Sequence, residues 1–388
     1  MKGIGEMNNM EEWKEYKLGD VSSVSSSKRI FADEYQSEGI PFYRSKEIIE
    51  KQKGISIANE LYIKESRYNE IKNKFGVPQK GDILLTSVGT LGIPYLVKDE
   101  IFYFKDGNIT WFYNFKGINN RYLYYWFLSP IAKHYFDIKA IGSTQKALTI
   151  ETLKKFDIVL PSKSIQQKVA DVLKSFDDKI ELNNRINANL EEQAQALFRH
   201  WFVDFEFPND QGLPYKSNGG AFANSEVGLI PQKWILTNLG EVTSQIKEKV
   251  NQRNDVKVLS PINTGKLVLS EDYFTKQIYS TNINKYIIVK PYDFAYNPAR
   301  VNIGSLGMNT FNFDGCVSPV YVVFRCEKRY QYFFDFFRKS ERFKKEVESR
   351  AIGGVRQNLS YDDFSLIQIV YPTKDVIENF NILYSKIL

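Results

Sequence analysis

The sequence predicts an α+β protein built from two similar domains that are separated by a long coiled-coil helix. Three observations support this fold class. The chain repeats itself once, each copy mixes short β-rich runs with helical stretches, and the segment between the copies lacks Gly and Pro for more than forty residues.

The repeat is clearest at the two ends of each copy. Trp13 and Leu18 recur as Trp234 and Leu239, both displaced by 221 positions (234 − 13 and 239 − 18). Residues 142–161 align without gaps on residues 353–372, displaced by 211 (353 − 142). Two shorter landmarks lie between them: residues 89–92 are echoed at 304–307, and residues 106–109 at 314–317. Four landmarks in one order, with drifting offsets, indicate two copies of one domain with different loops.

Within each copy, periodicity predicts both kinds of secondary structure. Residues 82–88 and 318–325 are β-rich, whereas residues 120–136 and 330–349 have helical character. We therefore expect α+β domains at residues 12–161 and 231–372. The sequence diverges between the landmarks, where loops carried by a constant scaffold tend to hold function.

A central helix is predicted over residues 162–207, starting at a capping box formed by Ser164 and Gln167. A helix of about forty residues would be on the order of 60 Å long. Its apolar positions alternate at spacings of four and three, which is typical of a coiled-coil seam that needs a partner helix. The seam consists of Val169, Leu173, Phe176, Ile180, Asn183, Asn187, Leu190, Ala194, Leu197 and Trp201. Its two Asn residues either set the register or form a solvated gap.

Two further segments complete the chain. Residues 208–230 have the Gly, Pro and Ser content of a linker. Residues 373–388 start a second helix that stops early when compared with the central one. Either the natural chain is shortened there, or the partner for the seam comes from another molecule, such as a second copy of the chain.

Composition narrows the function classes. No apolar run reaches the roughly 20 residues that span a bilayer, and residues 1–10 are too polar for a secretory signal, so we expect no membrane contact and a cytoplasmic location. With only two cysteines and two histidines, a zinc site and a disulfide framework are not expected. We also expect no metal and no cofactor. We expect Cys316 and Cys326 to be buried and His134 and His200 to have packing roles. The net charge of +6 permits nucleic-acid binding without requiring it.

Catalytic motifs are only partly matched. Residues 296–299 resemble the Asn-Pro-Pro-Tyr motif of amino-methyltransferases but lack the second Pro and the Tyr. Residues 264–267 resemble part of a P-loop, yet Leu267 stands where a Ser or Thr would hold magnesium. Residues 70–72 form a nuclease-like Glu-Ile-Lys without an acidic partner. The sequence therefore predicts a protein that is not itself an enzyme.

The helix end Leu197-Phe-Arg-His-Trp-Phe-Val-Asp-Phe205, followed by Ile230-Pro-x-x-Trp234 and the paired Gly blocks, resembles the specificity (S) subunit of type I restriction-modification systems. The resemblance covers about residues 12–372. It implies that each repeat is a target recognition domain that reads one half of a bipartite site in double-stranded DNA. It also implies two methyltransferase (M) subunits on the helical region, and restriction (R) subunits recruited through the M complex. The short final helix departs from the family pattern.

Sequence reading requires side chains that present paired donors and acceptors to base edges. In the first copy the loop candidates are Lys28, Arg29, Arg44, Ser45, Lys46, Ser87, Thr90, Gln145 and Lys146. In the second copy they are Arg253, Asn263, Thr264, Lys266, Asn297, Arg300, Asn302, Arg356 and Gln357. Gln145, Lys146, Arg356 and Gln357 are the strongest, because they follow the equivalent glycines Gly142 and Gly353.

Two other functions compete with this hypothesis. The duplicated domains and helix would also suit a protein-binding scaffold that does not read DNA. An autonomous DNA-modifying enzyme is the third possibility. A salt-dependent shift with duplex DNA distinguishes the first two, and S-adenosylmethionine binding to the isolated chain would reveal the third.

Overall fold

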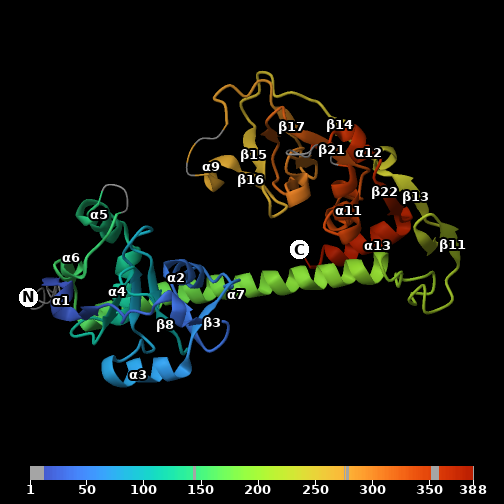
Figure 1. The fold of residues 1–388 in the computed structure, drawn as a ribbon. Helices are drawn as coiled ribbons and strands as arrows, with labels where there is room; N and C mark the ends of the chain where they lie inside the picture. Colours follow the sequence, from blue (N-terminus) through green and yellow to red (C-terminus); the bar gives the residue numbers. More distant parts are fainter. Residues whose placement is uncertain (1–12, 143–145, 275, 277–278, 351–357, 388) are drawn as a thin grey trace, which may run out of the picture. The chain divides into compact units, whose positions relative to one another are not determined.

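The computed structural model describes residues 13–142, 146–274, 276, 279–350 and 358–387. The chain forms two compact units, one ending at Asn183 and the other starting at Asn184. The division falls inside a single continuous helix, α7 (Lys163–Phe202), which is 40 residues long (Figure 1). This confirms the predicted fold class, in which a long helix lies between two α+β domains. The helix ends at Phe202, before the end of the predicted range 162–207.

The first unit contains two four-stranded sheets, ordered β2-β9-β6-β7 and β3-β5-β4-β8, and a separate pair, β1 with β10. All neighbours are antiparallel except β4 and β8, which run parallel. Its strands are β1 (Lys14–Lys17), β2 (Ser23–Ser25), β3 (Tyr35–Gln36), β4 (Ile40–Tyr43), β5 (Leu61–Ile63), β6 (Ile83–Thr86), β7 (Pro94–Leu96), β8 (Tyr103–Phe104), β9 (Ile109–Tyr113) and β10 (Asp157–Leu160). Its helices before α7 are α1 (Leu18–Val21), η1 (Ala32–Glu34), α2 (Ser45–Gln52), α3 (Glu65–Phe75), α4 (Asn120–Leu128), α5 (Pro130–Lys139) and α6 (Ile150–Lys154).

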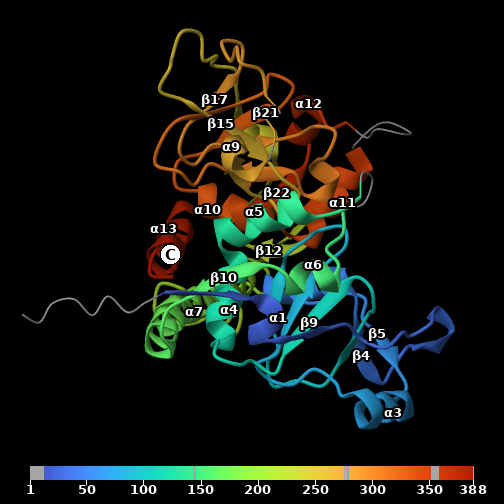
Figure 2. The ribbon, with the colours of Figure 1, turned by 90° about the vertical axis from the view of Figure 1, so that its left-hand side faces the viewer.

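Apolar side chains of the sheets and helices hold the first unit together. All four residues of β6 are buried, and Phe112 of β9 packs against Phe127 of α4 with 5.0 Å between ring centroids. At the other sheet, Tyr68 and Ile71 of α3 join the core beside β4 and β5 (Figure 2). The start of α4 is fixed by Asn119, whose side chain accepts a hydrogen bond from the Tyr122 amide.

The second unit repeats this arrangement, with sheets ordered β14-β21-β18-β19 and β16-β15-β20-β17 and the pair β13 with β22. Its strands are β11 (Phe222–Ser225), β12 (Gly228–Pro231), β13 (Ile235–Asn238), β14 (Thr243–Ile246), β15 (Lys257–Pro261), β16 (Leu267–Leu269), β17 (Ile287–Val289), β18 (Phe294–Tyr296), β19 (Leu306–Met308), β20 (Gly315–Val317), β21 (Val322–Cys326) and β22 (Gln368–Tyr371). Its helices after α7 are α8 (Leu239–Val242), α9 (Ser270–Tyr273), η2 (Val301–Ile303), α10 (Gln331–Phe337), α11 (Glu341–Arg350), α12 (Tyr361–Ser365) and α13 (Lys374–Tyr384).

The two outer landmarks of the repeat occupy equivalent places. Strand β1 and helix α1 correspond to β13 and α8 at the displacement of 221. Helix α6 and strand β10 correspond to α12 and β22 at the displacement of 211. In both units the landmark strands pair with each other, β1 with β10 and β13 with β22. The duplication read from the sequence is therefore present in the structure at both ends of each unit.

The landmark at residues 106–109 does not occupy the same place in the fold as residues 314–317, so the sequence alignment was wrong there. Asp106 lies in the turn after β8, the strand that runs parallel to β4. Asp314 instead precedes β20, the strand that runs parallel to β15. The fourth strand of the second sheet also differs, since β3 adds beside β5 whereas β17 adds beside β20. Asp-Gly pairs are common turn signals, so their recurrence does not fix a register.

The end of α7 is part of the core of the second unit. Phe202 packs edge-on against Phe380 of α13 with 5.0 Å between ring centroids, and Trp201 lies 5.9 Å from the same ring. The segment that follows has more structure than the predicted linker, because β11 and β12 form an antiparallel hairpin. Phe207 also stacks on Trp234 at 5.0 Å.

The start of α7 differs in detail from the predicted capping box. The helix begins at Lys163, so Ser164 is already inside its first turn. The Gln167 side chain bonds Asn119 and Asp171 instead of a helix-capping amide. In the described part of the chain, no helix combines the length and the apolar character needed to cross a bilayer.

Candidate nucleic-acid interface

In the first unit, three of the predicted DNA-binding loops meet at the turn between β8 and β9. The carbonyl oxygen of Asn108 accepts hydrogen bonds from the Ser87 amide at 2.8 Å and from the Ser45 hydroxyl at 3.4 Å. The Gly107 amide donates to the Ser26 hydroxyl at 3.3 Å. Loops that are far apart in the sequence are thus brought together at residues 106–108.

A further predicted loop lies beside the β6–β7 loop. The Gly89 amide donates to the Lys146 carbonyl at 3.1 Å, and the Leu148 amide donates to the Ser87 carbonyl at 2.8 Å. Thr90 and Lys146 are both exposed here. The two loops and α5 border an open hollow of about 320 Å³. It is lined by Gly89, Leu91, Lys133, Phe136, Asp137 and Lys146. The candidate Gln145 lies outside the described residues.

The second unit makes the equivalent connection. The Leu359 amide donates to the Pro298 carbonyl at 3.1 Å, which ties the segment before α12 to the β18–β19 loop. Leu148 and Leu359 are the residues that the sequence aligned at a displacement of 211. The same pair of loops is therefore set side by side in both copies. The candidates Arg356 and Gln357 fall in the part of the chain that is not described.

The β18–β19 loop of the second unit also lies against the turn between β15 and β16. A Cβ atom added at Gly304 would lie only 2.7 Å from the Asn263 carbonyl oxygen. Arg338, 7% exposed, joins the two elements because its Nη atoms donate to the carbonyls of Gly265 and Leu306, both at 2.8 Å. The candidates exposed on this surface are Asn263, Thr264, Lys266, Arg300 and Asn302.

Several predicted contacts have other roles in the structure. Ser87 is buried, and its hydroxyl is engaged by Thr110 at 2.6 Å, so it supports the loop and does not face solvent. The partly buried Asn297 accepts a hydrogen bond from the Ala299 amide, which shapes its own turn. Lys46 remains exposed beside Glu50, with 3.7 Å between the Lys46 Nζ and Glu50 Oε1 atoms.

Arg44 is held by the carboxylate of Glu47. Its Nε atom lies 3.1 Å from Oε2 and its Nη2 atom lies 2.6 Å from Oε1. Glu47 is 1% exposed. Burial acts to raise the pKa of Glu47, but hydrogen bonds from the Arg44 side chain and backbone outweigh it, and the pKa is lowered. One edge of the Arg44 guanidinium is therefore committed to anchoring α2.

Arg253 is bound by two carboxylates. Its Nε and Nη2 atoms donate to Asp255 at 2.9 and 2.6 Å, and its Nη1 atom donates to Asp314 at 2.9 Å. These hydrogen bonds raise the pKa of the guanidinium. Both Nη groups of Arg253 are therefore already engaged by carboxylates.

Arg29 contrasts with Arg253. Its Nε atom donates to Asp106 Oδ2 at 2.9 Å, and 68% of its side chain is exposed. The neighbouring Lys28 places its Nζ atom 4.4 Å from the centroid of the Phe75 ring. The amide of Lys28 donates to the Tyr103 hydroxyl at 2.6 Å. This loop therefore presents two cations from a well-anchored backbone.

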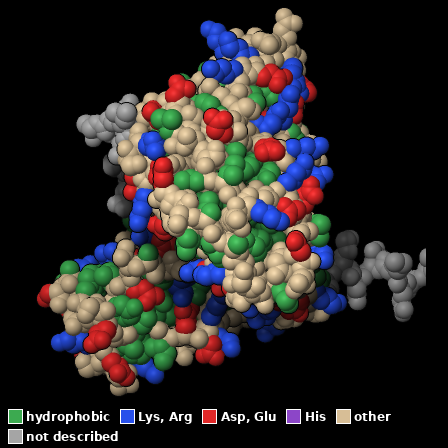
Figure 3. Space-filling view, turned by 90° about the vertical axis from the view of Figure 1, so that its right-hand side faces the viewer, with side chains coloured by type: hydrophobic (Ala, Val, Ile, Leu, Met, Phe, Trp, Pro, Cys, Tyr) green, Lys and Arg blue, Asp and Glu red, His purple; other side chains and the backbone are tan. Residues whose placement is uncertain are grey.

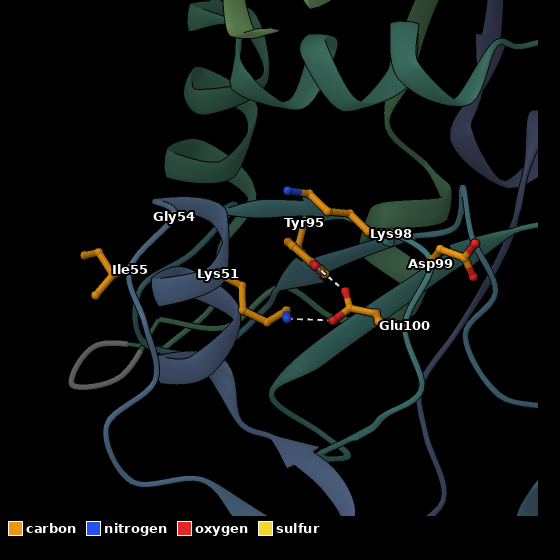
Figure 4. Close-up of a pocket in the computed structure, with 7 residues that line it drawn as sticks. All are labelled: Lys51, Gly54, Ile55, Tyr95, Lys98, Asp99 and Glu100. Carbon is orange, nitrogen blue, oxygen red and sulfur yellow. Dashed lines mark hydrogen bonds and ion pairs between the residues drawn. The ribbon is translucent and has the colours of Figure 1, made fainter. Parts of the chain in front are cut away.

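A second hollow of the first unit, of about 350 Å³, lies at the C-terminal end of α2, near Lys51 and Gly54 (Figure 4). Lys51 and Tyr95 both point toward Glu100, and the Lys51 Nζ atom lies 2.6 Å from Glu100 Oε2. The charges of these groups are balanced against one another. The hollow is thus accounted for by a structural network that links α2 to the segment after β7.

The cysteines and histidines lie in different environments in the structure. Cys316 and Cys326 are buried as predicted, and burial raises the pKa of the Cys316 thiol to about 12. His134 and His200 are exposed, so the predicted packing roles were wrong. Among the residues that the structure describes, no three His, Cys, Asp or Glu side chains are grouped to hold a metal ion.

The sequence is similar to those of known proteins. Residues 10–192 match the family described as type I restriction modification DNA specificity domain. The chain is 30% identical over 240 residues to the type I restriction enzyme MjaIX specificity subunit of Methanocaldococcus jannaschii, a match that covers 60% of this chain and 52% of that protein. It is 30% identical over 209 residues to the HindI specificity subunit of Haemophilus influenzae, covering 51% and 42%.

These matches span about half the length of the curated relatives. Among solved structures, the chain is similar to the S subunit of a type I restriction-modification system from M. genitalium. The TM-score is 0.58 and the sequence identity 14%, with 98% of this chain and 92% of that chain covered. At 14% sequence identity, this similarity is evidence for the fold alone.

Proposed function

We propose that this chain is a specificity subunit of the type I restriction-modification family, that it is the DNA-reading subunit of its complex, and that each unit reads one half of a bipartite site. The observation that carries the proposal is the matched pair of hydrogen bonds made by Leu148 and Leu359. In each copy, this hydrogen bond holds two loops of differing sequence side by side on the shared scaffold. Divergent side chains on equivalent loops suit two different half-sites.

Specific contacts have to supply the selectivity. On the face shown in Figure 3, Lys and Arg side chains are interspersed with Asp and Glu. A surface of mixed charge attracts DNA less strongly than a continuous basic patch, and phosphate contacts carry no sequence information. Base contacts from the loop residues therefore have to distinguish one sequence from another.

The helical region is the proposed docking site for two methyltransferase subunits, which in turn would recruit restriction subunits. In the first unit, the seam of α7 exposes Val169, Leu173, Phe176 and Ile180, with Phe176 60% and Ile180 58% exposed. Exposed apolar residues in a continuous stripe mark interaction surfaces. A second copy of the chain on the same stripe is the competing occupant. Catalysis is assigned in this proposal to the partner subunits.

The experiment combines the purified chain with the methyltransferase subunit of its system and a labelled duplex library with randomised positions. We expect enrichment of a two-part motif with an unspecified spacer, and binding that weakens steeply as salt rises. Sedimentation analysis of the chain alone and of the complex identifies the occupant of the stripe. A complex that forms but enriches no sequence would instead support the protein-binding scaffold.

A further inference from the structure

We propose that Arg29 is a specificity-determining residue that reads a guanine in the half-site of the first unit, and that Asp106 is the residue that positions it. The inference rests on the proposed function and names one contact within it. Its starting point is the ion pair between Arg29 Nε and Asp106 Oδ2, 2.9 Å apart, at the turn where three loops of the first unit meet.

The geometry leaves the outer end of the guanidinium available. A guanidinium has five N–H donors, and the Nε atom carries one of them. The single hydrogen bond described for Arg29 uses that inner donor, and the side chain is 68% exposed. The two Nη groups then form an outward fork. Such a fork matches the O6 and N7 acceptors of guanine, the commonest specific contact in the major groove.

The backbone that carries Arg29 is anchored on both sides. The preceding amide, that of Lys28, donates to the Tyr103 hydroxyl at 2.6 Å. The Ser26 hydroxyl donates to the Ile109 carbonyl at 3.0 Å, and the following residue, Ile30, is only 4% exposed. A side chain on a fixed backbone loses less conformational entropy on binding, which favours precise base contacts over loose phosphate contacts.

Asp106 has the properties of a positioning carboxylate. Only 18% of its side chain is exposed, so it is held in place, whereas its arginine extends into solvent. The carboxylate restricts rotation of the guanidinium about its last bonds and keeps the fork turned outward. Asp106 also lies in the β8–β9 turn, whose Gly107 amide donates to the Ser26 hydroxyl. This bond ties the turn that holds Asp106 to the loop that holds Arg29.

Two other candidate arginines are more fully committed to carboxylates than Arg29. Arg44 donates from Nε and Nη2 to Glu47, and Arg253 donates from Nε and Nη2 to Asp255. In each, a carboxylate already occupies one side of the guanidinium in the bidentate manner that a guanine would require. Arg29 has the same chemistry with its fork unoccupied by any described residue.

The test uses the full chain in complex with the methyltransferase subunit and the randomised duplex library. Wild type is compared with Arg29→Ala, Arg29→Lys, Asp106→Asn and Asp106→Glu. The Lys80–Asp99 pair supplies matched controls, because its side chains are 72% and 91% exposed in the same unit. Lys80→Ala and Asp99→Asn therefore remove the same charges at exposed positions that are not among the candidate residues. Melting temperatures verify that each variant is folded.

We expect Arg29→Ala to abolish a guanine preference at one position of one half-site, a loss of roughly 5- to 100-fold in discrimination. Arg29→Lys should not restore it, because an ammonium lacks the planar fork. Asp106→Asn should reduce the same preference by about threefold to tenfold while leaving or slightly raising affinity for random DNA, since a negative charge is removed. Asp106→Glu should recover part of the preference. The two control variants should leave the motif unchanged.

The proposal is overturned if Arg29→Ala leaves every position of the motif unchanged. It is also overturned if that variant weakens all sequences equally and lowers the salt dependence by about one unit of slope, the signature of a phosphate contact. If the wild-type complex enriches no motif, the proposed function itself fails. That result is distinguishable from the loss of one contact within an otherwise intact motif.

Discussion

Trp13 and Trp234 occupy equivalent positions in the two units, yet Trp13 is 55% exposed and Trp234 is 4% exposed. The difference arises from the segment at the end of α7, where Phe205 and Phe207 lie 5.5 and 5.0 Å from the Trp234 ring. Equivalent residues in a duplicated fold can therefore contribute differently to the free energy of unfolding.

This difference gives the first prediction. Trp234→Ala should lower the free energy of unfolding of the second unit by about 3–5 kcal/mol, because a large aromatic side chain leaves a cavity. Trp13→Ala is the matched control and should change stability by less than about 1 kcal/mol. Urea unfolding followed by far-UV circular dichroism measures both. Equal losses in the two variants would show that Trp13 is covered in solution.

The second prediction concerns the α7 stripe. Phe176→Glu should abolish co-purification of the methyltransferase subunit with little change in melting temperature, because the side chain is 60% exposed. Ser175→Glu adds the same charge to an exposed position outside the seam and should leave the complex intact. Loss of the partner in both variants, or in neither, would argue against docking on this stripe.

The third prediction follows from the lowered pKa of Glu47. A carboxyl group whose pKa is lower in the folded state stabilises the fold above its unfolded pKa of about 4.3, and this contribution fades as the pH falls through the folded pKa. Glu47→Gln should therefore cost about 1–2 kcal/mol at pH 7, with a smaller difference from wild type below about pH 4. Denaturation between pH 3 and 7 measures the trend. A difference that grows on acidification would show that the sign is reversed.

The fourth prediction concerns Arg338, which ties Gly265 to Leu306. Arg338→Lys should destabilise the second unit by about 1–3 kcal/mol, since an ammonium cannot span both carbonyls and one of them would lose its partner. The neighbouring Lys339, 39% exposed, provides the control variant Lys339→Ala. Thermal unfolding should separate the two, and binding of the second half-site should weaken only in the Arg338 variant.

Much of the fold could be read from the sequence because its signals are local. An uninterrupted stretch without Gly or Pro predicted the 40-residue helix, and two gap-free landmarks predicted the equivalent ends of the two units. The interior of the repeat was less readable. The Asp-Gly pairs that begin at residues 106 and 314 are turn signals. The first pair follows β8, whereas Asp314 of the second precedes β20, the equivalent strand.

The site could be predicted only as a set of loops. Arg29 and Asp106 are 77 positions apart, so no local pattern could show that they pair. The same limit applies to Ser87, whose burial depends on the strand partner that carries Thr110. Arg44 was more accessible to sequence reasoning, since Glu47 follows at the spacing that allows an ion pair on a helix. Which candidate side chains are exposed and which are engaged within the fold thus depended on long-range contacts.

The most direct test of two equivalent DNA-reading units is to sequence methylated positions in DNA from cells that produce this chain with its methyltransferase subunit. The account predicts modified bases in one two-part motif with a fixed, unspecified spacer, and a changed first or second half when the loops of the corresponding unit are exchanged for those of a relative. A single contiguous motif, or no motif that depends on this chain, would contradict it.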